Sequence, residues 1–143
     1  DGVGSDAESN RKSLEISLDY IQATGIDCFA PAIGNAHGVY KETPKLDFQR
    51  VSDITHAVPI PIALHGGTGL TKEQFQDLIA RGCAKVNIST ALKITFMQSN
   101  LAFLRDAEAK NKWDPPSQFA FVRKAVMAMV TEYLQIFGSA GRA

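Results

Sequence analysis

Apolar residues recur along the chain with two alternating patterns. Leu14, Leu18 and Ile21 are spaced as on one face of a helix, whereas the following residues, 26–33, are almost continuously apolar. The first pattern predicts an amphipathic helix, and a short unbroken apolar run is typical of a strand buried on both faces of a parallel sheet. Because Pro31 has no N–H to donate to a ladder, we expect a bulge or an early end in this strand.

Capping signals delimit the helices that the pattern predicts. Ser5 and Thr71 each precede a helical pattern and are followed three residues later by Glu or Gln, which is the spacing of a capping box. Gly25 and Gly82 follow the last helical positions, where glycine commonly ends a helix. The predicted helices cover residues 5–24, the region around 46–54, and residues 71–81, 90–110 and 117–137; the predicted strands cover 26–33, 59–65 and 84–88.

This order, α-β-α-β-α-β-α-α, predicts an α/β fold with a parallel sheet and right-handed crossovers. Three parallel strands alone leave two exposed sheet edges. A (β/α)8 TIM barrel needs about 250 residues, and the chain has 143. We therefore expect residues 1–143 to be part of a single TIM-barrel domain, contributing about three βα units and a terminal helix. The missing half or another copy would cover the edges.

Composition excludes several classes of protein. The chain has 15 Lys+Arg against 15 Asp+Glu and is 45% hydrophobic, which excludes disordered, collagen-like and coiled-coil chains. Without a basic surplus, neither nucleic acid nor a membrane is an expected partner. No apolar run reaches a membrane span, and no signal peptide opens the chain, whose first residues resemble a loop within a protein. Cys28 and Cys83 lie in apolar runs, so we expect reduced core thiols in a cytoplasmic protein.

Two histidines follow successive predicted strands. His37 and His65 hold equivalent places on adjacent βα units, beyond the carboxyl ends where such folds carry functional groups. Adjacent strands lie about 4.8 Å apart, so the two imidazoles could share one metal ion. Neutral imidazole is a common zinc ligand, and catalytic zinc usually takes three protein ligands. The alternative for each histidine is a hydrogen bond within its own loop.

A glycine-rich segment follows His65. Residues 66–69, of sequence GGTG, precede a capped helix, and glycines there would let the backbone approach an anion such as phosphate near the helix start. A plain tight turn is the alternative. Asn87 and Thr90 add an amide and a hydroxyl after the third predicted strand. The alternative is helix capping by Ser89 or Thr90, which accounts for Thr90 but not for Asn87.

Three segments together resemble a known family. Residues 33–38 (IGNAHG), 64–69 (LHGGTG) and 85–90 (KVNIST) resemble, in this order, the class II metal-dependent ketose-bisphosphate aldolases, in the fructose- and tagatose-bisphosphate branch. The resemblance runs over essentially the whole chain and covers only the C-terminal half of the family. It implies a cytoplasmic, homo-oligomeric TIM-barrel lyase of glycolysis and carbohydrate metabolism. Such an enzyme reversibly cleaves a ketose 1,6-bisphosphate to dihydroxyacetone phosphate and glyceraldehyde 3-phosphate.

The resemblance also implies roles for individual residues. His37 and His65 match two of the three zinc-binding histidines, and Zn²⁺ would act as a Lewis acid on the ketone carbonyl. A monovalent cation, Na⁺ or K⁺, would lie near the phosphate. The residues that match those holding the C1 phosphate and the ketone end of the substrate are Gly38, Gly66, Thr68, Asn87 and Thr90.

Part of the implied site is absent from the chain. The third zinc histidine and the aspartate that acts as acid and base belong to earlier strands of the family, so we expect the chain alone to be inactive. The family usually has Thr in place of Asn35 and Ser in place of Thr68. Thr68 keeps the hydroxyl group, and Asn35 lies outside the ligand set.

Two other functions fit the same residues. A barrel phosphosugar isomerase or epimerase would share the phosphate site without zinc. A non-catalytic half-barrel would bind a sugar phosphate and associate with itself. Zinc that is lost in the variant His65→Ala would favour the aldolase over the isomerase or epimerase. Sulfate or phosphate at the glycine loop beside an empty, disordered pair of His37 and His65 would favour the half-barrel.

Overall fold

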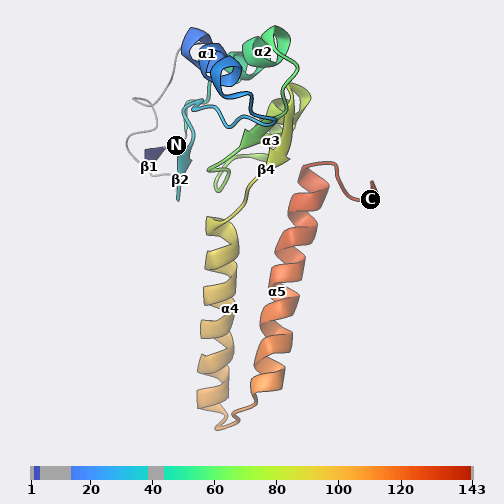
Figure 1. Cartoon of the computed structure of the whole chain (residues 1–143). Coiled ribbons are helices and arrows are strands. Elements are labelled where there is room, and N and C mark those ends of the chain that lie inside the picture. Colours follow the sequence, from blue (N-terminus) through green and yellow to red (C-terminus); the bar gives the residue numbers. More distant parts are fainter. Residues whose placement is uncertain (1, 4–13, 39–43, 143) are drawn as a thin grey trace. The chain divides into compact units, whose positions relative to one another are not determined.

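The computed structural model describes residues 2–3, 14–38 and 44–142, and the chain divides into two compact units, Asp1–Ile88 and Ser89–Ala143. Figure 1 shows their helices and strands. The first unit contains β1 (Gly2–Val3), α1 (Leu14–Thr24), β2 (Ala36–His37), α2 (Phe48–Ala57), β3 (Ile62–Leu64), α3 (Lys72–Ala80) and β4 (Cys83–Val86), and the second contains α4 (Thr90–Ala109) and α5 (Pro115–Ile136). Within the described ranges, none of these helices has the length and apolar character needed to cross a membrane.

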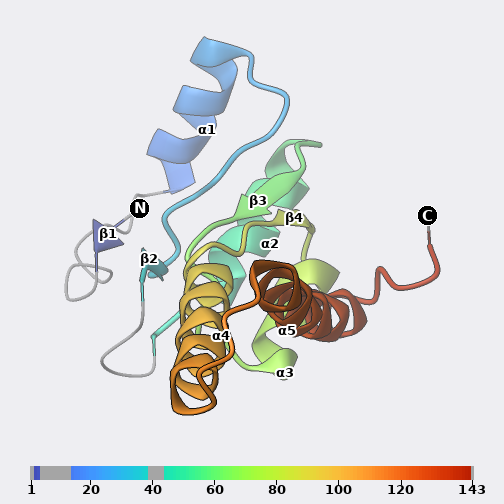
Figure 2. The ribbon, with the colours of Figure 1, turned by 90° about the horizontal axis from the view of Figure 1, so that it is seen from below.

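The described strands of the first unit pair in parallel. β3 pairs with β4, and Phe29 forms a parallel bridge to Ile62 at the start of β3. The N–H of Phe29 donates to the carbonyl of Pro61 (3.0 Å), and the N–H of Ala63 donates to the carbonyl of Phe29 (2.8 Å). Three successive segments therefore lie side by side in chain order; Figure 2 shows β3 beside β4. The predicted parallel arrangement of strands alternating with helices is confirmed.

The first predicted strand is much shorter than the apolar run indicated. Only Phe29 of residues 26–33 bridges to another strand, and the pairing ends before Pro31, as expected for a residue without an N–H. The chain then forms β2, which pairs in parallel with β1. The expectation of a loop at the start of the chain is therefore wrong for β1. A strand of two residues is too short to show the alternation of apolar and polar residues that predicts a strand from sequence.

Capping residues set the ends of the helices. The Thr71 hydroxyl accepts the N–H of Gln74 (3.2 Å), and the Gln74 side chain accepts the N–H of Thr71 (2.8 Å), so the predicted capping box of α3 is complete. Gly25 has φ +61° directly after α1. Ser5, the predicted cap of the first helix, lies outside the described residues. α5 begins at Pro115, two residues before its predicted start, because proline suits a first helical turn, whose N–H groups have no helical partner.

The core of the first unit lies between its strands and helices α2 and α3. Ile62 and Leu64 of β3 are almost fully buried, and so are Phe75 and Leu78 of α3. α3 packs against β4 and against α2. The apolar stripes of the two helices therefore support the strands whose ends carry the polar segments.

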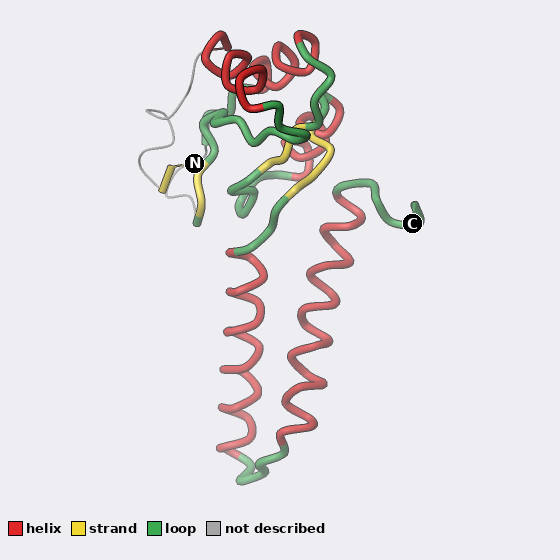
Figure 3. The backbone as a smooth tube through the Cα atoms, viewed as in Figure 1, coloured by secondary structure: helices red, strands yellow, loops and turns green. Residues whose placement is uncertain are grey.

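The second unit is an antiparallel pair of long helices. α4 and α5 run beside each other and are joined by a short turn (Figure 3). The rings of Phe103 and Phe121 lie 5.9 Å apart between centroids, and the Gln118 side chain donates to the Asn100 amide oxygen (2.8 Å). These contacts fix the face that each helix turns toward the other.

Gly82 lies at the junction between α3 and β4, where no other residue fits. Its φ of +113° is unfavourable for any residue with a Cβ, and a Cβ there would lie 2.7 Å from Cγ2 of Thr55. The Thr55 hydroxyl in turn donates to the carbonyl of Arg81 (3.0 Å). The close approach of α2 to this junction therefore depends on the missing side chain.

We predict that Gly82→Ala lowers the free energy of unfolding by about 3 kcal/mol, because backbone strain adds to the clash with Thr55. Gly25→Ala is the matched control: its φ is +61°, with nothing within 4 Å of an added Cβ. The control should lose only about 1 kcal/mol. Urea denaturation followed by circular dichroism measures both losses. Equal losses would show that the contact with Thr55 contributes nothing.

The two cysteines differ in exposure. Cys83 is 2% exposed in β4, whereas Cys28 is exposed, and both are free thiols. The prediction of core thiols is therefore right for Cys83 and wrong for Cys28, whose neighbourhood has a single bridge instead of a covered strand. Burial raises the pKa of Cys83 to about 12.

We predict that a thiol-reactive aromatic disulfide modifies Cys28 quickly at about pH 8, and Cys83 only as the chain unfolds. The thiolate is the reactive form, and a raised pKa together with burial removes it from Cys83. Absorbance of the released thiol gives the rates, and Cys28→Ser should leave only the slow phase. A fast phase in Cys28→Ser would contradict the burial of Cys83.

Candidate functional site

Hydrogen bonds join the ends of three successive segments of the first unit. The side-chain amide of Asn35 donates to the carbonyl of His65 (2.9 Å). The N–H of Asn87 donates to the carbonyl of Leu64 (2.9 Å), the residue before His65. The structure therefore brings together residues 35, 65 and 87, each of which follows a different segment of the parallel arrangement.

Asn35 is the buried link in this arrangement. Asn35 is 2% exposed. Its amide oxygen accepts the N–H of Ile33 (3.0 Å), and its amide nitrogen donates to the carbonyl of His65. One side chain thus fastens the segment that leads into β2 to the end of β3. Asn35 lies outside the ligand set that the sequence predicts. The signal that could have found it is an amide at the end of an apolar run, because a buried amide requires hydrogen-bond partners.

The two predicted zinc ligands lie on the segments that Asn35 connects. His65 directly follows β3 and is half-buried, and His37 is the last residue of β2, two residues after Asn35. The side chain of His37 lies outside the described part of the structure, so the meeting of the two imidazoles stays a prediction. Among the residues that are described, no three His, Cys, Asp or Glu side chains form a metal-binding group.

The glycine-rich segment is packed tightly against α3. Gly66 and Gly69 have φ of +63° and +96°. A Cβ on Gly67 would lie 2.9 Å from the ring of Phe75 and 3.2 Å from the side chain of Ile88, so only glycine fits this contact without a shift. The capping box already uses two N–H groups at the start of α3. An anion in this region would therefore be held by the loop rather than by those capped groups.

The remaining candidates differ in position. Thr68 and Asn87 are half-buried in the first unit, and Gly38 has φ +103° with open space where a Cβ would be. Thr90 is the first residue of α4 in the second unit, and Ser89 is the N-cap residue, without a side-chain capping bond. Of the two capping residues that the sequence offers, Ser89 therefore holds the N-cap position and Thr90 does not.

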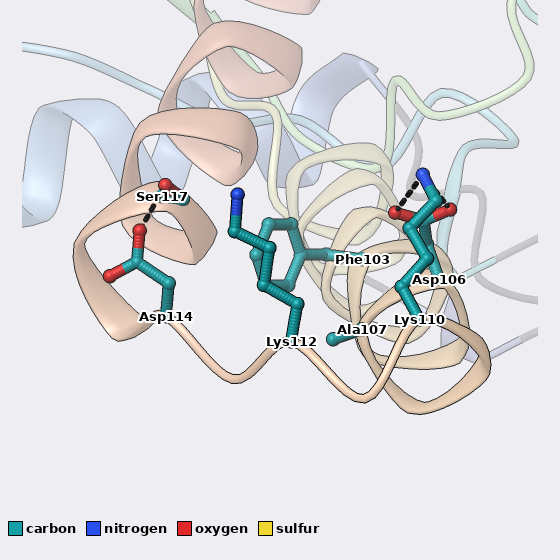
Figure 4. A pocket seen from close by; sticks show the side chains of 7 residues that line it. All are labelled: Phe103, Asp106, Ala107, Lys110, Lys112, Asp114 and Ser117. Atoms are coloured by element: carbon teal, nitrogen blue, oxygen red, sulfur yellow. Dashed lines mark hydrogen bonds and ion pairs between the residues drawn. The ribbon is translucent and has the colours of Figure 1, made fainter.

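A separate hollow of about 210 Å³ lies in the second unit near the turn between α4 and α5 (Figure 4). Lys110 of its lining binds Asp106 (2.8 Å), and the hydroxyl of Ser117 donates to Asp114; Lys112 also lines the hollow. α5 begins with two prolines, which have no N–H to offer an anion. This hollow contains none of the predicted site residues.

Comparison with known proteins decides the family. The family model of class II fructose-bisphosphate aldolases matches residues 1–142. The chain belongs to this family. It is 40% identical over 125 residues to the fructose-bisphosphate aldolase of Geobacillus stearothermophilus and 42% identical over 129 residues to that of Streptococcus pneumoniae. These alignments include 87% and 84% of this chain but 43% and 44% of the relatives, so the chain spans less than half their length.

Solved structures agree with this assignment. The YdjI aldolase of Escherichia coli K12 matches with a TM-score of 0.78 and 32% identity, over 92% of this chain and 47% of that protein. A putative fructose-1,6-biphosphate aldolase from Coccidioides immitis also has a TM-score of 0.78, with 31% identity over 92% of this chain and 44% of that protein. The resemblance to class II aldolases, and to their C-terminal half, is confirmed.

We predict that Asn35→Ala lowers the free energy of unfolding by about 2–4 kcal/mol, because it leaves the N–H of Ile33 and the carbonyl of His65 without their buried partner. Asn100→Ala is the matched control. The Asn100 side chain also makes two hydrogen bonds, one of them exposed and one partly buried, so its loss should cost less than about 1 kcal/mol. Denaturant titration measures both, and similar losses would contradict the special role of Asn35.

Proposed function

We propose that the chain is the C-terminal part of a zinc-dependent (β/α)8 aldolase that reversibly cleaves a ketose 1,6-bisphosphate, fructose or tagatose. The products are dihydroxyacetone phosphate and glyceraldehyde 3-phosphate. The observation that carries this proposal is the hydrogen-bonded junction of residues 35, 65 and 87 in a chain of the class II family. The parallel segments in chain order support the barrel.

The side chains present are of a type that binds zinc. His37 and His65 offer imidazole nitrogens, which zinc prefers, and Asn35 immobilises the backbone at the second of them through a buried hydrogen bond. When bound there, zinc supplies Lewis-acid polarisation of the substrate carbonyl. The proposed set is one ligand short of the three that catalytic zinc usually takes.

The loop after β3 and the residues beside it would bind the phosphate end of the substrate. Gly38 has open space where a Cβ would be, Gly66 has a φ of +63°, and Thr68 carries a hydroxyl group. Asn87 and Thr90 contribute an amide and a second hydroxyl, and Na⁺ or K⁺ would balance charge beside the phosphate. Such contacts lie away from the reacting carbons, so they orient the ketone end without taking part in bond cleavage.

The chain alone lacks parts that the reaction requires. The third zinc ligand and the acid/base aspartate belong to the part of the family that this chain does not span, so we propose that these 143 residues are inactive without it. The sheet is open as well: in the part of the chain that the structure describes, no strand pairs with the free edge of β4. The missing half would supply strands to such edges. We expect the assembled protein to be cytoplasmic and to bind neither nucleic acid nor membranes.

We predict that the full-length protein binds zinc stoichiometrically and cleaves fructose or tagatose 1,6-bisphosphate. His65→Ala should weaken zinc binding and cleavage by more than about a hundredfold, because it removes a direct ligand. His56→Ala, at an exposed site on α2, should leave both unchanged. Metal analysis and a coupled assay of triose phosphate release measure the two effects.

Each alternative has its own outcome in this experiment. A protein without zinc that releases no triose phosphate but converts the sugar phosphate to an isomer or epimer would be an isomerase or epimerase. Sugar-phosphate binding without turnover would identify a binding module. Aldol cleavage by the 143-residue chain at the rate of the full-length protein would overturn the proposed inactivity.

A further inference from the structure

A side chain continues the pairing between β3 and the segment before it. The backbone of this segment bridges to β3 at one point, where Phe29 lies opposite Ile62. Farther along, Pro31 has no N–H to donate to β3. Beyond Pro31, the side-chain amide of Asn35 donates to the carbonyl of His65 (2.9 Å). Asn35 therefore adds a second link between the two segments, past their backbone bridge.

The amide group of Asn35 takes the place that a peptide group has in a strand. Its oxygen accepts the N–H of Ile33 (3.0 Å), and its nitrogen donates to the carbonyl of His65. A peptide group likewise has one acceptor and a separate donor. Because Asn35 is 2% exposed, both bonds lie away from bulk water, where a hydrogen bond is stronger. The two bonds together fix the orientation of the amide.

This link restrains the backbone at His65. The peptide group before the Cα of His65 is held through the carbonyl of Leu64, which accepts the N–H of Asn87 (2.9 Å). The peptide group after this Cα is held by Asn35. Because a peptide group is planar, restraining both planes restrains the backbone angles of His65 and the direction of its Cα–Cβ bond. Asn35 thus supplies one of two restraints on the direction in which the imidazole leaves the backbone.

The same link acts on the strand that carries His37. Among the described strands, β2 pairs with β1 and β3 pairs with β4, in two separate sheets (Figure 2). His37 is the last residue of β2, and Asn35 directly precedes β2. The Asn35 amide therefore connects the strand of His37 in one sheet to the end of β3 in the other, where His65 lies.

We propose that Asn35 is a positioning residue of the zinc site. Its side chain sets how the backbones of His37 and His65 lie relative to each other, and through them the affinity of the site for zinc. This inference rests on the proposed function. Zinc binds its ligands at short, narrowly defined distances, so a shift of either backbone weakens the site. Groups that orient metal ligands contribute about ten- to a hundredfold to metal affinity.

The connection by a side chain makes this role separable from the fold. The pairs β1–β2 and β3–β4 are held by their own backbone hydrogen bonds. A substitution of Asn35 leaves these bonds in place and removes the link between the two sheets. We therefore expect a folded protein with a displaced pair of histidine backbones.

Two substitutions of Asn35 divide its bonds. Asn35→Ala removes both of them. Asn35→Ser keeps a hydroxyl that can accept the N–H of Ile33, because that N–H belongs to the same short segment and can adjust. The hydroxyl ends one bond closer to the backbone than the amide nitrogen, so it does not span the distance to the carbonyl of His65. Asn35→Ser thus tests the link between the segments by itself.

Gly82→Ala is the control for a general loss of stability. Its predicted loss in the free energy of unfolding is similar to that of Asn35→Ala. Gly82 directly precedes β4, at the amino ends of the strands, whereas the residues joined by Asn35 lie at the carboxyl ends. A role of Asn35 in stability alone would therefore give both variants the same zinc affinity.

The test measures zinc binding by the full-length protein. Competition with a chelator gives the dissociation constant of zinc, and the visible absorption of Co²⁺ in place of zinc reports the coordination geometry. We expect Asn35→Ala and Asn35→Ser to weaken zinc binding by about tenfold or more and to change the Co²⁺ spectrum. Gly82→Ala should leave both unchanged. Circular dichroism confirms that each variant is folded, and Asn35→Ser carries the test if Asn35→Ala does not fold.

Each outcome decides between the proposals. Wild-type zinc affinity and an unchanged Co²⁺ spectrum in Asn35→Ser would overturn the positioning role, because the link to His65 would then have no effect on the site. Equal weakening by Gly82→Ala would also overturn it, since stability would explain the effect. A wild-type protein that binds no zinc would overturn the proposed function as well. Equal zinc binding by the wild type and the Asn35 variants would overturn the positioning role alone.

Discussion

The parallel pairing of successive segments is the constraint on which the rest of the first unit depends. α2 and α3 each carry the chain back to the side of the sheet where the strands begin. The segment at Phe29, β3 and β4 therefore run in the same direction, and their carboxyl ends lie along one side of the sheet. Residues far apart in the chain then meet there, as His65 meets Asn35 across 30 positions. The buried rings and aliphatic side chains beneath the strands hold this edge in place, so the polar segments need little structure of their own.

Local signals in the sequence were the most reliable. Thr71 and Gln74 form a capping box because both groups needed for it lie three residues apart, and Gly82 ends α3 because its backbone excludes a side chain. Strand length was predicted less well, since pairing depends on a partner strand. The apolar run around Cys28 yields one bridge, and the residues of β1 become a strand only by pairing with β2.

The sequence proposes site residues where a motif carries the chemistry, and it misses a contact between distant residues. Histidines beside glycines stand out by residue type, and for this reason His37 and His65 are zinc-ligand predictions. The role of Asn35 depends on the carbonyl of His65, which no local pattern reveals. The asparagine amide has a separate donor and acceptor, so one side chain can accept from Ile33 and donate to His65 at the same time. The double link from Ile33 to His65 therefore suits asparagine.

The edge of β4 constrains the kind of segment that can extend the sheet. Among the described residues, no strand pairs with this edge, which presents directional N–H and C=O groups. Another strand satisfies these groups well, because its own N–H and C=O groups have the same spacing. Helices pack through apolar side chains and leave such groups without partners. The chemistry of the edge therefore favours a further strand over a helix as the element that covers it.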